Sequence, residues 1–93
     1  MKYTVKLTSQ FKRDYKLALK QHRDITLLDD VIKLLMNGVQ LPREYNDHPL
    51  QGNWRGHREC HILPDWLLIY KVDNNVLVLT LTRTGTHSEL FDE

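Results

Sequence analysis

The sequence predicts one α+β domain in which a helical hairpin packs on a small, mainly antiparallel sheet, in the order β-α-α-β-β-β. Apolar residues recur with a helical period only in the first half of the chain, and the second half alternates or runs apolar between turn signals. A chain of 93 residues builds one hydrophobic core, so residues 1–93 are expected to form a single domain. Two helices on one face of a sheet bury both apolar surfaces.

The first strand and helix follow from two different periods. Residues 2–7 alternate polar and apolar side chains, as a half-buried strand does. Thr8 or Ser9 can cap the helix that follows. The apolar stripe predicted for this helix consists of Phe11, Tyr15, Ala18, Leu19 and His22.

A second helix is expected after Asp24. Thr26 and Asp29 have the spacing of a capping box, and Gly38 supplies the signal that ends the helix. The connection between the two helices is short, so they form an antiparallel hairpin.

The second half of the chain predicts a loop, three strands and a short tail. Residues 41–52 carry two prolines and a glycine and are expected to be a loop. Pro64-Asp65 separates the first two strands, and three turn-forming residues separate the next two. The three strands predicted here are residues 54–62, 66–72 and 76–82. Residues 85–91 are expected to form a loop or one helical turn.

Composition restricts the class of function. No apolar run reaches the ~20 residues that span a bilayer, and no secretory signal pattern stands at the start, so a membrane role is not expected. Cys60 is the only cysteine, which excludes an intrachain disulfide. We therefore expect a cytoplasmic protein. The net charge of +1 is too low for a protein that grips RNA through phosphate contacts alone.

All of the five histidines except His22 follow residue 47. Several imidazoles in one small domain indicate acid–base chemistry or a metal site. The ligand spacings of known zinc motifs are absent, so we expect no metal ligand set and no cofactor, although Cys60 or Asp65 could complete one. His22 and His57 are expected to carry no chemistry.

The remaining histidines each allow two interpretations. His48 is either a loop residue bonded to backbone or a catalytic group. His61 is either part of a structural pair or a general base whose ring Asp65 orients. His87 is the strongest candidate, because Gly85 and two threonines place it on a tight turn just after a buried strand.

Two neighbours of His87 extend the candidate site. Arg83 closes an apolar strand, where it forms either a salt bridge or a planar contact to phosphate. Phe91 is either a core residue or an aromatic that stacks on a base. Histidines, an arginine and an aromatic together fit RNA cleavage without a metal, which needs a base, an acid and a cation near the phosphorane.

A basic stripe marks the first helix. Lys12, Lys16 and Lys20 recur every four residues and are expected to face away from the apolar stripe. Such a stripe is either a solvated surface or a grip on nucleic acid or on an acidic partner.

Three segments resemble one family closely. They are DHPLQGNW at residues 47–54, HILPDW at 61–66 and RTGTHSELF at 83–91. The chain resembles the YafQ-type toxins of bacterial toxin–antitoxin systems, within the RelE/ParE superfamily, over essentially its whole length. Some relatives have Asp where this chain has Glu59, a change that keeps the charge.

This resemblance implies a ribosome-dependent mRNA endoribonuclease that is silenced by a DinJ-like antitoxin. Its partners would be the ribosome with mRNA in the decoding site and the ribosomal RNA, which the basic stripe could contact. The implied catalytic residues are His48, His61, Asp65, Arg83 and His87. The implied substrate contacts are Arg58, Glu59, Trp66 and Phe91. We favour His87 as the acid, with His61 or His48 as the base.

Two other classes stay open at this point. ParE-like relatives with the same fold poison DNA gyrase without nuclease chemistry, and the chain could also be a binding module with structural histidines. The histidine set argues against the gyrase-poisoning class, because binding a topoisomerase needs no acid–base groups.

Overall fold

The computed structural model describes residues 2–91. Over these residues, two long helices follow the first strand, and they are followed by four further strands, two 3-10 turns and a short helix. In order these elements are β1 (Thr4–Leu7), α1 (Ser9–Lys20), α2 (Ile25–Met36), η1 (Arg43–Tyr45), β2 (His48–Pro49), η2 (Gly52–Trp54), β3 (Arg58–Leu63), β4 (Trp66–Asp73), β5 (Val78–Gly85) and α3 (His87–Phe91). Within this part of the chain, no helix has the length and apolar character needed to cross a membrane.

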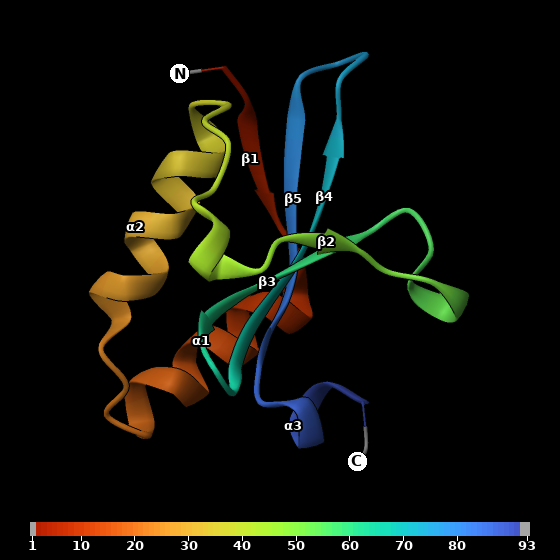
Figure 1. Ribbon diagram of the computed structural model, residues 1–93. Coiled ribbons are helices and arrows are strands. Elements are labelled where there is room, and N and C mark those ends of the chain that lie inside the picture. Colours follow the sequence, from red (N-terminus) through yellow and green to blue (C-terminus); the bar gives the residue numbers. More distant parts are fainter. Residues whose placement is uncertain (1, 92–93) are drawn as a thin grey trace.

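The five strands form one mixed sheet in the order β1-β5-β4-β3-β2. β1 runs parallel to β5, and the other neighbouring pairs are antiparallel. Figure 1 shows α2 along one side of the strands and α1 passing behind their lower ends, whereas α3 and the β2–β3 connection extend on the side away from α2. The predicted α+β class is confirmed, with β2 and α3 as elements beyond the predicted order.

Side-chain caps begin both long helices. Thr8 Oγ1 accepts a hydrogen bond from Phe11 N and donates one to Thr82 O, so the same hydroxyl caps α1 and ties it to β5. The capping box expected between Thr26 and Asp29 is wrong: Asp24 is the cap, and its carboxylate accepts from Thr26 N and Thr26 Oγ1. Gly38, with φ of +71°, ends α2 as expected.

The apolar stripe of α1 is narrower than the sequence indicates. Phe11 and Ala18 are buried, but Leu19 is 48% exposed. His22 lies beyond the end of α1 with φ of 58°, in the turn between the helices. The face that packs on the sheet carries Phe11, Asp14 and Ala18, and Leu19 points about 100° away from Ala18.

The strand predicted to begin at Trp54 begins at Arg58 instead. Gly52 and Gly56 adopt φ of +64° and +91°, which breaks extended backbone between residues 52 and 56. The preceding loop contains the two-residue strand β2, whose His48 lies opposite Glu59 of β3.

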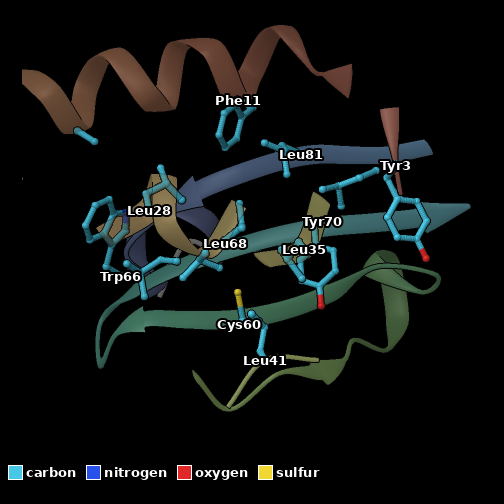
Figure 2. Packing of buried hydrophobic residues seen from close by; sticks show 14 residues of the cluster. Tyr3, Phe11, Leu28, Leu35, Leu41, Cys60, Trp66, Leu68, Tyr70 and Leu81 are labelled. Carbon is cyan, nitrogen blue, oxygen red and sulfur yellow. The ribbon is translucent and has the colours of Figure 1, made fainter. Parts of the chain in front are cut away.

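The main core lies between the helical hairpin and the facing side of the sheet. Figure 2 shows Phe11 of α1 pointing toward Leu81 of β5, while Trp66 and Tyr3 lie at opposite ends of the cluster. Because side chains alternate along a strand, neighbouring residues of β4 such as Leu67 and Ile69 join a smaller cluster on the other face.

Cys60 is expected to be chemically inert in the folded protein. Its side chain is fully buried, and burial raises the pKa of the thiol to about 12, with the Asp47 and Glu59 carboxylates adding to the shift. The thiolate fraction near pH 8 is then lower by a factor on the order of 10³ than in the unfolded chain. Labelling with a chromogenic disulfide should therefore be slow in buffer and fast in denaturant. Fast labelling of the native protein would contradict this burial.

Candidate active site

Three histidines from three elements meet on the sheet face opposite the helical hairpin. Alternation along β3 puts Glu59 and His61 on that face, because their neighbours Cys60 and Ile62 belong to the main core. β2 brings His48 beside them, and α3 brings His87. The ring centroids of His48 and His61 are 6.2 Å apart, and those of His61 and His87 are 5.8 Å apart. We call His48, His61 and His87 the histidine row.

Glu59 lies between two rings of this row. Its Oε1 is 3.4 Å from His48 Nε2 and 3.5 Å from His61 Nε2, and its side chain is only 7% exposed. The Nδ1 atoms of both rings approach backbone carbonyls, Asn46 O at 2.7 Å and Pro64 O at 3.3 Å. A carbonyl only accepts, so Nδ1 carries the hydrogen in each contact. With its hydrogen on Nδ1, a neutral ring has only an acceptor at Nε2, and the Glu59 carboxylate is also an acceptor. A hydrogen bond between either Nε2 and Glu59 therefore requires one additional proton, on the ring or on Glu59. This arrangement is suited to proton transfer.

A capping box and a hairpin turn position His87. Thr86 Oγ1 accepts from Glu89 N, and Glu89 Oε1 accepts from Thr86 N, so α3 begins at His87. Asp65, in the tight turn between β3 and β4, accepts from His87 N at 3.1 Å and lies 2.7 Å from His87 Nδ1. Asp65 therefore orients His87, and the expectation that it orients His61 is wrong.

Asp65 remains an anion beside the His87 ring. Hydrogen bonds from the side chain and backbone of His87 hold the pKa of Asp65 below its usual value, although the carboxylate itself is exposed. Because the folded-state pKa is lowered, this stabilising contact is present above the unfolded pKa and is lost only as pH falls through the folded value. The pair is intact throughout the neutral range.

Two aromatic side chains extend the histidine row. Phe91 packs at a centroid distance of 6.4 Å from His87 and lies edge-on to Trp54, at 6.3 Å. Trp54 was not among the predicted site residues, because the sequence placed it in a strand rather than in η2. It supports Phe91 and also contacts His57 edge-on at 5.5 Å.

Arg83 forms the salt bridge that the sequence offered as one alternative. Its Nε and Nη2 donate to the two oxygens of Asp14 on α1, at 2.8 and 3.2 Å. Asp14 is buried and also accepts from Thr84 N at 3.1 Å. This salt bridge holds α1 against β5, the strand that precedes His87.

Two expected substrate contacts lie on the helix side of the sheet. Trp66 is 1% exposed in the main core, and its Nε1 donates to Thr84 Oγ1 at 3.0 Å, so it cannot reach a bound RNA. Arg58 alternates away from Glu59, and its guanidinium contacts Asp47. Glu59 is buried beneath the histidine row, where it positions the imidazole rings of His48 and His61. The sequence contains a sign of this role, because residues two apart on a strand, such as Glu59 and His61, lie on the same face of the sheet.

The basic stripe is exposed, but its orientation differs from the prediction. Lys12 and Lys16 line a groove together with apolar residues of β1, α1, α2 and β5, so these two lysines do not face away from the apolar stripe. The apolar residues of this groove are Val5, Leu7, Phe11, Tyr15, Ile32 and Leu81. Lys20, at the end of α1, does not line it.

One set of side chains has metal-ligand character. Glu59, His61 and His87 each offer a ligand atom, and these atoms lie within 4.8 Å of one another. The spacing of known motifs did not reveal this group, because its members come from β3 and α3.

The fold and the histidine row define a small α+β domain with acid–base groups on an exposed sheet face. The model of the family "Bacterial toxin of type II toxin-antitoxin system, YafQ" matches residues 3–92. The chain is 46% identical over 88 residues to the mRNA interferase toxin YafQ of Escherichia coli K12, which covers 94% of each protein.

Solved structures agree with this match. YafQ from E. coli BL21(DE3) superimposes with a TM-score of 0.91 at 43% identity, covering 96% of this chain and 98% of that one. YafQ in the E. coli DinJ–YafQ complex gives 0.89 at 44% identity, with the same coverage. A metal-bound toxin from Helicobacter pylori gives 0.90 at 39% identity, covering 96% and 99%. The chain belongs to the YafQ family of toxins of bacterial type II toxin–antitoxin systems.

Proposed function

We propose that this chain is an mRNA endoribonuclease that cuts messages on the ribosome and thereby stops translation. The observation that carries the proposal is the histidine row, with Glu59 between two rings and Asp65 on the third. The relative from E. coli K12 is named for mRNA interferase activity, which supports the same reaction here.

The proposed reaction uses two proton transfers. His61 or His48 takes the 2′-hydroxyl proton, and the 2′-oxygen attacks the adjacent phosphorus. The bond from phosphorus to the 5′-oxygen breaks as His87 gives that oxygen a proton, leaving a 2′,3′-cyclic phosphate and a 5′-hydroxyl. Protonated imidazoles beside the phosphorane stabilise its charge. Asp65 keeps the His87 ring in position through Nδ1.

Other side chains support this chemistry. Phe91, at the end of the row, offers a face on which an exposed base can stack. Arg83 has a positioning role in this scheme, since Asp14 engages its guanidinium. No metal ion takes part in the proposed steps.

The ribosome holds the RNA, because the toxin itself has too little positive charge to bind it tightly. With a net charge of only +1, the chain relies on ribosome-held mRNA, and the exposed lysines of α1 add contacts to ribosomal RNA phosphates. This assignment places the protein in the cytoplasm, where translation occurs.

A cognate antitoxin is the second proposed partner. Two structures of E. coli YafQ hold it in complex with DinJ, and we propose a DinJ-like protein as the partner of this chain.

The proposal is tested with translating ribosomes and a reporter mRNA. Purified toxin should produce new 5′-hydroxyl ends within the reading frame, and it should leave the same mRNA intact when ribosomes are omitted. Strong induction in cells without antitoxin should arrest growth and deplete full-length mRNA. Growth arrest with intact mRNA and inhibited DNA gyrase would favour the ParE-like alternative. Normal growth with soluble toxin would refute both.

The lysines of α1 are expected to contribute to ribosome binding. Changing Lys12, Lys16 and Lys20 to Gln should weaken binding and flatten its dependence on salt, because fewer counterions are released. Cleavage by bound toxin should be almost unchanged, since the three lysines lie on α1 and the histidine row lies on the opposite sheet face. Binding is measured at two salt concentrations. Equal affinity and equal slope would mean that the lysines are only a solvated surface.

A further inference from the structure

We propose that a cluster of side chains on the helix side of the sheet positions His48 of the histidine row. The cluster consists of Asp47, Arg58 and Tyr70, and we call it the Asp47 cluster. Its effect on cleavage rests on the nuclease function proposed above, whereas its effect on the His48 ring does not.

His48 lies on β2, a strand of two residues. β2 pairs with β3 at His48–Glu59 and Pro49–Arg58. Segments that make few buried contacts open at a low cost in free energy. The other two histidines of the row lie on the six-residue strand β3 and at the start of α3, which has its own capping box. The position of His48 therefore depends strongly on the side chains next to β2.

The residue before His48 anchors β2 to two other strands. Asp47 Oδ1 accepts hydrogen bonds from the Tyr70 hydroxyl at 2.5 Å and from Arg58 Nε at 3.3 Å, and Asp47 Oδ2 accepts from Arg58 Nη2 at 3.4 Å. Arg58 of β3 and Tyr70 of β4 lie opposite each other in the sheet. The Asp47 carboxylate thus joins the start of β2 to both β3 and β4, through hydrogen bonds that its charge strengthens.

The anchor and the imidazole lie on opposite faces of the sheet. Tyr70 is 2% exposed and belongs to the main core (Figure 2). Burial raises the pKa of Tyr70, and the hydrogen bond and charge of Asp47 add to this shift, so the hydroxyl keeps its proton and donates. Successive side chains of an extended segment point to opposite faces, so Asp47 points to the core while His48 points to Glu59. A carboxylate fixed on one face therefore sets the place of the ring on the other.

Weakening this anchor is expected to move His48 relative to Glu59 and to slow cleavage. Tyr70→Phe leaves the contacts from Arg58 in place, so a loss of roughly 10-fold is expected, whereas Asp47→Ala removes every contact and should cost on the order of 10²-fold, the loss for a misplacement of about 1 Å. Asp47→Asn keeps an oxygen that can accept from Tyr70 and should lose less than Asp47→Ala.

The position of the His48 ring is tested by NMR of the free full-length toxin, without RNA. The imidazole signals of His48 are assigned by their loss in His48→Ala. Tyr70→Phe and Asp47→Ala should shift these signals. The signals of His22 should stay in place, since this residue lies in the turn between α1 and α2.

Tyr3→Phe is the matched control. Tyr3 also belongs to the main core and lines the same surface cavity as the Asp47 cluster, but its hydroxyl donates to Asn74 Oδ1 at 2.6 Å. The variant therefore loses the same hydroxyl from the same region without releasing Asp47. It should leave the His48 signals close to their original positions and cut mRNA at the normal rate.

The route through His48 is tested by a double-mutant cycle, with single-turnover cleavage of ribosome-bound reporter mRNA as the readout. In the His48→Ala background, Tyr70→Phe should cause no further loss of rate, because the ring that the Asp47 cluster positions is already absent. A loss through general destabilisation would be the same in both backgrounds.

Unchanged His48 signals in Tyr70→Phe would overturn the positioning role, and this variant decides the question if Asp47→Ala does not fold. A rate loss that is equal in both backgrounds, or equal to that of Tyr3→Phe, would overturn the route through His48. Shifted signals with normal cleavage would overturn the link to catalysis. If the signals shift as expected and the unmodified toxin does not cut mRNA, the nuclease function fails and the positioning of His48 stands.

Discussion

Replacing His87 with Ala is expected to lower the rate of mRNA cleavage by about 10²–10⁴-fold, which is the usual loss when a general acid is removed. The His87 side chain is 42% exposed at the start of α3, so its loss removes little packing. The rate is measured in single turnover on ribosome-bound reporter mRNA. Circular dichroism and the thermal midpoint should stay close to those of the unmodified protein.

Two further variants make this experiment decisive. His22→Ala controls for the loss of any exposed imidazole and should cut at the normal rate. Asp65→Asn should reduce the rate less than His87→Ala, because it leaves the ring in place while weakening its orientation. Cleavage by His87→Ala at the normal rate would exclude His87 as the acid, and unfolding would show that its role is structural.

Replacing Trp66 with Ala is expected to destabilise the fold by about 3–5 kcal/mol, the range for truncating a buried large aromatic side chain. This is a large part of the total stability of a small domain, about 5–15 kcal/mol. Trp66 is 1% exposed at one end of the main core, and its loss also removes the donor to Thr84 Oγ1. The thermal midpoint should fall by roughly 15–30 °C in calorimetry.

Trp66→Phe separates packing from substrate binding. Phe keeps most of the apolar contact but loses the hydrogen bond to Thr84 and part of the ring volume, and the hydrogen bond alone costs about 1–2 kcal/mol. Cleavage by Trp66→Phe should be close to normal at a temperature where it is folded. A large loss of cleavage in this stable variant would restore Trp66 as a substrate contact.

Local periodicity was enough to predict the architecture. Alternation in residues 2–7 and the helical stripes placed β1, α1 and α2 within a few residues, because amphipathic segments record which face is buried. The start of β3 was misplaced because Trp54 and Gly56 continue an alternating pattern through a segment that Gly52 and Gly56 bend by positive φ. A polar–apolar pattern carries no information on the sign of the backbone angle φ.

The site was predicted only in part, and the prediction did not come from periodicity. Their settings in the sequence marked His48, His61 and His87 as candidates, the motif resemblance implied a catalytic role for them, and the structure brings them into one row. The resemblance did not separate residues that face RNA from residues that support the site, since both occur in the same segments. Trp66 directly follows Asp65 in the chain, yet Trp66 is buried in the main core whereas Asp65 is exposed and contacts His87. Pairing Asp65 with His87 required the turn between β3 and β4 to be known.

The parallel pairing of β1 with β5 sets the order of events when the chain is made. Residues 4–7 of β1 find their partners at residues 78–81, and α1 also packs on β5 through Thr8 and Asp14. Neither the first strand nor the first helix can dock on the sheet until β5 has left the exit tunnel, because contacts between distant segments form only once both are available. His87 emerges later still. We therefore expect the histidine row to stay unassembled in the nascent chain for as long as β5 and α3 are inside the exit tunnel.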